Sequence, residues 1–209
     1  MLRQQLWKGS APLTVTTFLM LGALAIASIG LAVDPRLITG APAWLKPAKF
    51  AVSVGIYTAT LAWIFSLLPE WTRTRRIVGW TTAVTLVLEV VLIDVQAFRG
   101  TTSHFNTSTL LDGVIFSVMG VAILIQTVST IWVAVALWRQ RFQDAALGWA
   151  LRLGMAVTIV GAMAGGLMTR PTQQQLEGAR AGQAMTVAGA HTVRRARRRP
   201  RAAGHGLEH

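Results

Sequence analysis

The chain has 209 residues, of which 53% are apolar and only 13% are charged, a balance that excludes an ordinary soluble domain. It has no cysteine, which excludes disulfides, thiolate zinc sites and iron–sulfur clusters. A formal net charge of +12 is typical of a nucleic-acid-binding protein, so the position of the charge along the chain matters. Half of it comes from six arginines near the carboxyl end: Arg194, Arg195, Arg197, Arg198, Arg199 and Arg201. We therefore expect a lipid bilayer as the partner and no nucleic acid.

The amino-terminal residues 1–11 are polar and basic, and an uncharged run over 12–33 follows them. As a helix this run is ~33 Å long, enough to cross the hydrocarbon core of a bilayer. A cleaved signal peptide is the alternative, because Arg3 and Lys8 resemble its basic leading segment. The apolar core of a signal peptide has only about 7–15 residues, so we expect a retained first membrane helix.

Four further apolar runs of membrane-spanning length follow, separated by polar or basic breaks. The predicted spans are 12–33, 50–68, 77–98, 113–137 and 145–168. They predict an all-α polytopic helix bundle of about five spans, with a membrane domain over 12–168 and an extracytoplasmic segment over 169–193. The break at 34–49 holds three prolines and a glycine and is predicted to be an irregular connection.

The distribution of Lys and Arg over the short connections predicts the orientation. The amino terminus, the 69–76 turn and the 138–152 region hold two, three and three of these residues, eight in all. The two connections on the opposite side hold four. Because positive charge concentrates on the cytoplasmic side, we expect the amino terminus to be cytoplasmic and the protein to lie in a plasma membrane.

Aromatic and small residues predict how the spans meet their surroundings. Six tryptophans fall near the ends of apolar runs, as in an interfacial aromatic belt: Trp7, Trp44, Trp71, Trp80, Trp138 and Trp149. Buried packing is the alternative for these rings. In the last span Gly161 and Gly165 form a G-x-x-x-G face, which predicts a close helix–helix partner.

Most of the ionisable or strongly polar groups near the predicted spans lie in one stretch of the chain. These are Glu89, Asp94, Gln96, Arg99, His104 and Asn106, with Lys46, Lys49 and Gln126 as candidate partners on other segments. On a helix Glu89 and Gln96 share a face and Arg99 follows one turn later, whereas Asp94 points elsewhere. A charge at the depth of Glu89 costs ~2.5–3.5 kcal/mol or more, so this group must be protonated, paired or hydrated.

Three interpretations of this polar set stay open. It is a structural cluster that joins helices, or an outward-facing pocket for a small ligand, an ion or a proton with Glu89 titrating. The third is an intramembrane hydrolase or transferase that uses His104 with Asp94 or Asp112. We expect no cofactor and no metal site, because no predicted span carries two histidines and no ligand spacing is recognisable.

Three segments give the chain a family resemblance: PAWLKPAKF at 42–50, RGTTSHFN at 99–106 and AGAHTV at 188–193. With them the chain resembles an uncharacterised family of bacterial multi-pass integral membrane proteins, over most of residues 12–193. The resemblance implies further spans beyond the AGAHTV segment. It implies no activity, cofactor or substrate.

The arginine-rich tail at 194–209 departs from that resemblance. Nucleic-acid binding and a solvated, disordered charge run are two interpretations of it. A third is that the tail is out of frame. A GC-rich coding of these residues, with one C removed, reads GAPDGGPGLPVTGWS, a Gly- and Pro-rich loop. We expect this frameshift, and with it a truncated membrane domain.

Overall fold

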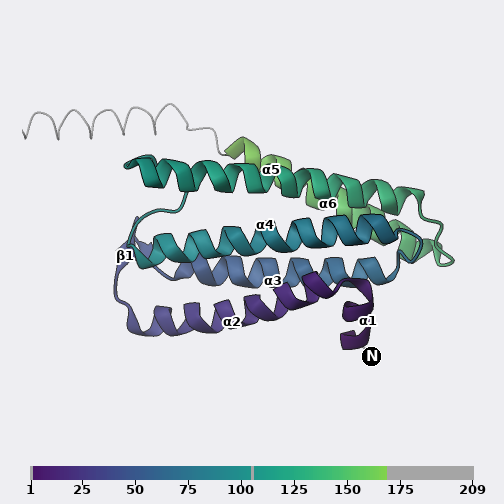
Figure 1. Cartoon of the computed structure of the whole chain (residues 1–209), viewed down its shortest axis with the longest axis horizontal. Helices are drawn as coiled ribbons and strands as arrows, with labels where there is room; N and C mark the ends of the chain where they lie inside the picture. The colour runs from purple at the N-terminus through teal and green to yellow at the C-terminus, as the bar shows by residue number, and fades with distance from the viewer. Residues whose placement is uncertain (1, 105, 169–209) are drawn as a thin grey trace, which may run out of the picture. The chain divides into compact units, whose positions relative to one another are not determined.

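The computed structural model describes residues 2–104 and 106–168. Its elements are α1 (Leu2–Gly9), α2 (Ala11–Val33), β1 (Leu37–Ile38), β2 (Ala41–Pro42), α3 (Leu45–Ser66), α4 (Thr72–Phe98), α5 (Leu110–Arg139) and α6 (Ala145–Met168) (Figure 1). One compact unit is Met1–Ala162, and of the second unit, Met163–His209, only the end of α6 is described. The predictions for 169–193 and 194–209, the frameshift included, lie outside the described residues.

The predicted all-α bundle of five spans is confirmed. Five helices, α2 to α6, are long and apolar enough to cross a membrane. Large apolar side chains remain exposed on them, for example Ile29 at 63%, Leu124 at 64% and Val157 at 71%. Such faces are a liability in water and ordinary in lipid, so the burial pattern agrees with the composition.

Four of the five membrane-length helices, α2 to α5, begin earlier than the predicted spans, because hydropathy marks the apolar middle of a helix and not its polar ends. α3 begins at Leu45 and not at residue 50, which places Lys46 and Lys49 inside the helix. Pro47 is tolerated there because the first turn of a helix has no acceptors for its N–H groups. α4 likewise begins at Thr72, and α5 begins at Leu110.

The core lies where α2, α3 and α4 run side by side and α5 packs on α4 (Figure 1). The main cluster is built on fully buried side chains of α3, including Phe65, and extends to Val133 and Leu137 of α5. Met155 of α6 also belongs to this cluster. Gly161 is exposed and no described atom lies within 4 Å of the position that its Cβ would take, so a helix partner at this face stays a prediction.

Two glycines permit the closest approaches. A Cβ on Gly9 would lie 1.8 Å from the carbonyl oxygen of Ala62, so only glycine lets α1 end against α3. A Cβ on Gly30 would lie 2.4 Å from the ring of Trp44. Trp44 is therefore packed against α2 and is not a member of an exposed belt.

A small hairpin closes the connection between α2 and α3. β1 and β2 pair antiparallel, with Ile38 opposite Ala41, and the two residues between them, Thr39 and Gly40, have φ values of 51° and 81°. Two successive positive φ angles are those of a type I′ turn, which matches the twist of a hairpin. The expected irregular connection is thus an ordered element.

The Asp34 carboxylate holds this hairpin at both ends. It accepts hydrogen bonds from Arg36 at 2.6–3.0 Å and from the Trp44 indole at 2.8 Å. Hydrogen bonds from Arg36 and then from Trp44 hold the pKa of the Asp34 carboxyl well below its usual range, and the same hydrogen bond to Asp34 raises the pKa of Arg36. Arg36 also donates to the carbonyl of Phe98 at 3.0 Å, which ties the hairpin to the end of α4.

Candidate functional site

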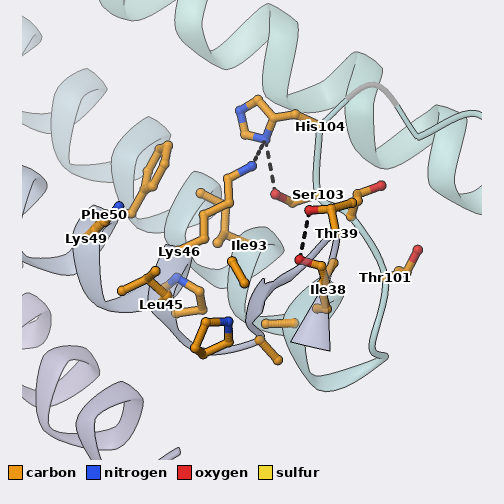
Figure 2. Close-up of a pocket in the computed structure, with 16 residues that line it drawn as sticks. Ile38, Thr39, Leu45, Lys46, Lys49, Phe50, Ile93, Thr101, Ser103 and His104 are labelled. Atoms are coloured by element: carbon orange, nitrogen blue, oxygen red, sulfur yellow. Dashed lines mark hydrogen bonds between the residues drawn. The ribbon is translucent and has the colours of Figure 1, made fainter. Parts of the chain in front are cut away.

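A cavity of about 490 Å³ lies between the hairpin, the first turns of α3, the end of α4 and the loop that follows it (Figure 2). Its walls are mostly apolar, with Ile38 and Pro42 from the hairpin, Phe50 from α3, and Ile93 and Ala97 from α4. Its polar lining comes from Thr39, Lys46, Lys49, Thr101, Thr102, Ser103 and His104. An apolar hollow with a few convergent polar groups is the usual form of a small-molecule site.

Lys46, Ser103 and His104 form the polar centre of this cavity. Figure 2 shows the Lys46 side chain reaching the His104 ring, where Nζ lies 2.9 Å from Nδ1. The Ser103 hydroxyl lies 3.1 Å from the same nitrogen. An ammonium group has no lone pair, so His104 Nδ1 must accept from it, and this contact assigns the ring proton to Nε2.

Electrostatics keep this histidine neutral. Burial and then the Lys46 charge lower the pKa of His104 to about 4. The ring therefore carries no charge at neutral pH and presents one acceptor to Lys46 and one N–H to its surroundings. A histidine in this state orients a cation well but accepts a proton poorly.

The Phe50 ring lies close to both the Lys46 ammonium group and the neutral His104 ring. The Phe50 ring centroid lies 6.0 Å from the His104 ring centroid and 5.8 Å from Lys46 Nζ. A cation over an aromatic face gains roughly 0.5–1 kcal/mol at exposed sites and more when desolvated. The ring thus compensates part of the cost of holding Lys46 in an apolar wall.

Glu89 lies one helical turn below Ile93, about 14 Å from the end of α4 at ~1.5 Å per residue. It is 3% exposed, and among the described residues its carboxylate forms no hydrogen bond and no ion pair. Lys46 is the charge that acts on it through space. Glu89 is thus a buried acid beneath the cavity floor, and Lys46, the charge that acts on it, lines the cavity.

Gln96 and Arg99 belong to a different group, which joins α4 to α5. Arg99 Nη1 donates to Gln96 Oε1 at 2.5 Å and to Asp112 Oδ1 at 2.7 Å, and Gln96 Nε2 donates to the same carboxylate oxygen at 3.0 Å. Asp112, expected at the end of a loop, is in the first turn of α5. Thr109 caps that turn, accepting from the Asp112 N–H at 3.2 Å and donating to its carboxylate at 2.7 Å.

Gln126 belongs to a third group at mid-bundle. It donates to the Tyr57 hydroxyl at 3.0 Å and lies 3.3 Å from the Thr85 hydroxyl, which donates to it. Tyr57 and Thr130 are 3.0 Å apart across α3 and α5. These bonds join three helices, which is the role of polar residues in membrane helix packing.

Of the remaining predicted site residues, Asn106 and Asp94 lie apart from the cavity, whereas Lys49 lines its rim. Asn106 shapes its own loop through bonds to Thr101 and Thr102 and to the N–H of Ser108. Asp94 is half-buried on another face of α4, as its position on the helix predicted. Lys49 is exposed at the rim of the cavity.

The catalytic alternative stays a prediction, and the contacts show which partners its residues have. His104 is engaged with Lys46 and Ser103, whereas Asp112 is engaged with Arg99, Gln96 and Thr109. A carboxylate raises the basicity of an adjacent imidazole, and a lysine lowers it. Among the described residues, no group of three or more His, Asp or Glu side chains could hold a metal ion.

Ser103, Phe50 and Tyr57 were missed by reasoning from the sequence. Ser103 adjoins His104 in RGTTSHFN, so its position was a usable signal. Phe50 and Tyr57 lie within an apolar run, and only the packing of α3 against its neighbours shows which way they face.

Comparison of the chain with protein-family models, curated proteins and solved structures finds no significant match. The resemblance drawn from PAWLKPAKF and RGTTSHFN therefore stays a prediction. Both segments nonetheless contribute to one cavity, through Lys46 and Phe50 from the first and Ser103 and His104 from the second.

Proposed function

We propose that this multi-pass protein resides in a bacterial plasma membrane and binds a small molecule with an apolar body and an anionic group in the Lys46–His104 cavity. One observation carries the proposal, the placement of Lys46 in a largely apolar hollow beside a neutral histidine. The charge count that favours a cytoplasmic amino terminus also favours a cavity open to the outer face.

The apolar body of the ligand follows from the walls. Ile38, Phe50, Ile93 and Ala97 offer hydrocarbon on several sides of the hollow. Burying apolar surface is worth ~25 cal/mol per Å², so a chain or ring of about six carbons gains several kcal/mol there. The volume lies within the range of ~300–1,000 Å³ for small-molecule sites.

The anionic group follows from the donors. Lys46 supplies a positive charge that lies beside a neutral imidazole, and Lys49 adds a second charge at the rim. The first turn of α3 also lines the cavity, and the N-terminal end of a helix favours an anion. A carboxylate or phosphate at Lys46 would gain charge-assisted hydrogen bonds in a poorly hydrated place.

A second candidate function is proton-linked binding, favoured by Glu89. This acid is 3% exposed below the cavity floor, and the Lys46 charge acts on it electrostatically. An anion that arrives at Lys46 would draw that charge away from Glu89 and favour protonation of the acid. Ligand binding would then take up a proton.

The test measures binding of three six-carbon probes to the protein in nanodiscs: hexyl phosphate, hexanoate and hexanol. We expect the two anions to bind and hexanol to bind much more weakly. Lys46→Met should raise the dissociation constant for the anions at least tenfold, about 1.4 kcal/mol. Arg141→Met, a loss of one positive charge at an exposed position outside the cavity, is the matched control and should change nothing.

Equal binding of hexanol and hexanoate, or an unchanged constant in Lys46→Met, would overturn the anionic site. The Glu89→Gln variant separates the second candidate. Proton uptake on binding, measured as a buffer-dependent heat, should vanish in that variant while anion affinity persists. Uptake that persists would assign the proton to another group.

A further inference from the structure

At the opposite end of the described bundle, α1 and the start of α4 enclose a second hollow of about 280 Å³. Its cationic lining is Lys8, Arg75 and Arg76, and no acidic residue is among the described residues that line it. Trp7 and Trp80, exposed at 42% and 58%, stand at its edges. Tryptophans of this kind mark the level of lipid headgroups.

This basic hollow adjoins an apolar groove. Ala11, Pro12 and Trp80 line both, so the two spaces meet at the start of α2. From there the groove, about 560 Å³, runs between α2 and α4 along Leu19, Val84, Leu88 and their neighbours. It lies on membrane-spanning helices, where its length is parallel to a lipid chain.

A buried hydroxyl at the same place has no partner. Ser10 is 7% exposed and lines the basic hollow, and among the described residues its Oγ has no hydrogen bond. A buried polar group without a partner costs roughly 1–3 kcal/mol. Gly79 leaves room for the Ser10 hydroxyl, since a Cβ at position 79 would lie 2.6 Å from Ser10 Oγ.

Arg75 shapes the hollow through the backbone. Its guanidinium donates to the Gly9 carbonyl oxygen at 2.9 and 3.2 Å and also to that of Lys8. These bonds satisfy carbonyls at the end of α1 while the positive charge stays at the hollow. Arg76 and Lys8 are exposed and add two more charges.

We propose that the hollow and the groove together bind one phospholipid with an anionic headgroup. The phosphodiester lies against Arg76 and Lys8, and one acyl chain lies in the α2–α4 groove. The basic lining supplies the charge complementarity, and the shared residues Ala11, Pro12 and Trp80 join the headgroup to the chain. The site is independent of the Lys46–His104 cavity.

The test reconstitutes the whole protein in nanodiscs of phosphatidylcholine with one-tenth phosphatidylglycerol and counts retained lipids by native mass spectrometry. We expect one phosphatidylglycerol to be retained in preference to phosphatidylcholine. Arg76→Gln should reduce this preference about fivefold, the effect of one basic residue near a lipid surface. Arg73→Gln removes an exposed charge from the same turn outside the hollow and should leave the preference unchanged.

The groove has its own variants. Val84→Trp fills it and should release the lipid, whereas Val95→Trp, on the same helix outside the groove, should not. Equal losses in Arg76→Gln and Arg73→Gln would mean a diffuse basic surface and would overturn the site. Displacement of the lipid by millimolar glycerol phosphate, which has no acyl chain, would overturn the role of the groove. Arg76→Gln should still bind hexyl phosphate at Lys46, so failure of one site is distinguishable from failure of the other.

Discussion

The two ends of the described bundle are closed by different chemistry. At the end that contains α1, arginines donate to backbone carbonyls: Arg75 to Lys8 and Gly9, and Arg152 to Leu137 at 3.1 Å and Gln140 at 2.9 Å. At the hairpin end Arg36 also donates to a backbone carbonyl, that of Phe98, but side chains contact each other around a hollow, as Lys46 does with His104.

This difference predicts which end of the bundle can change its conformation. Backbone carbonyls are displaced only if the helices themselves move, so the α1 end should be rigid. Side chains such as Lys46 and His104 move by rotating about single bonds, and the cavity between them remains open to a ligand.

The largest expected effect comes from filling the tight contact at the α1 end. Gly9→Ala puts a Cβ against the Ala62 carbonyl, so α1 must shift from α3, and we expect a loss of about 3 kcal/mol or more in the free energy of unfolding. Gly22→Ala, on α2 with nothing within 4 Å, is the control and should be neutral or slightly stabilising. Melting temperatures in one detergent compare them. Equal values would refute the rigid end.

A smaller effect is expected from the α4–α5 group near the hairpin end. Gln96→Leu removes a fully buried amide that both Arg99 and Asp112 contact, and we expect a loss of about 1–3 kcal/mol. Gln143→Leu, on the exposed 140–144 turn, should stay within about 0.5 kcal/mol. Chemical denaturation of the two variants measures the difference. A Gln96→Leu protein as stable as the control would mean that this group is dispensable.

The smallest effect is a pH dependence at the cavity. Burial and then the Lys46 charge lower the pKa of His104 to about 4 in the folded state, below the usual 6.5, so the unfolded chain takes up this proton first. The stability that depends on neutral His104 is complete above pH 6.5 and is lost as pH falls toward 4. We expect the melting temperature to fall over this window and to fall less in His104→Gln. Parallel curves for the two proteins would contradict the close contact with Lys46.

Several features of the site were predictable from the sequence because they depend on neighbours along one helix. The spacing of Gln96 and Arg99 placed them one turn apart on α4, and they are in contact. The same reasoning placed Asp94 on another face. It could not pair Lys46 with His104, which are 58 residues apart, because such a contact depends on how α3 and the 99–109 loop meet.

The sequence by itself determined the all-α class and the five spans, because apolar runs of sufficient length have to satisfy their backbone within helices. Only the tertiary structure decided that the polar residues fall into separate groups, at the cavity, between α4 and α5, and at mid-bundle. The physical reason is that a hydrogen bond is directional and short, so helix rotation and loop closure select which groups meet. The same packing left Glu89 beneath the cavity floor, facing Lys46 through space.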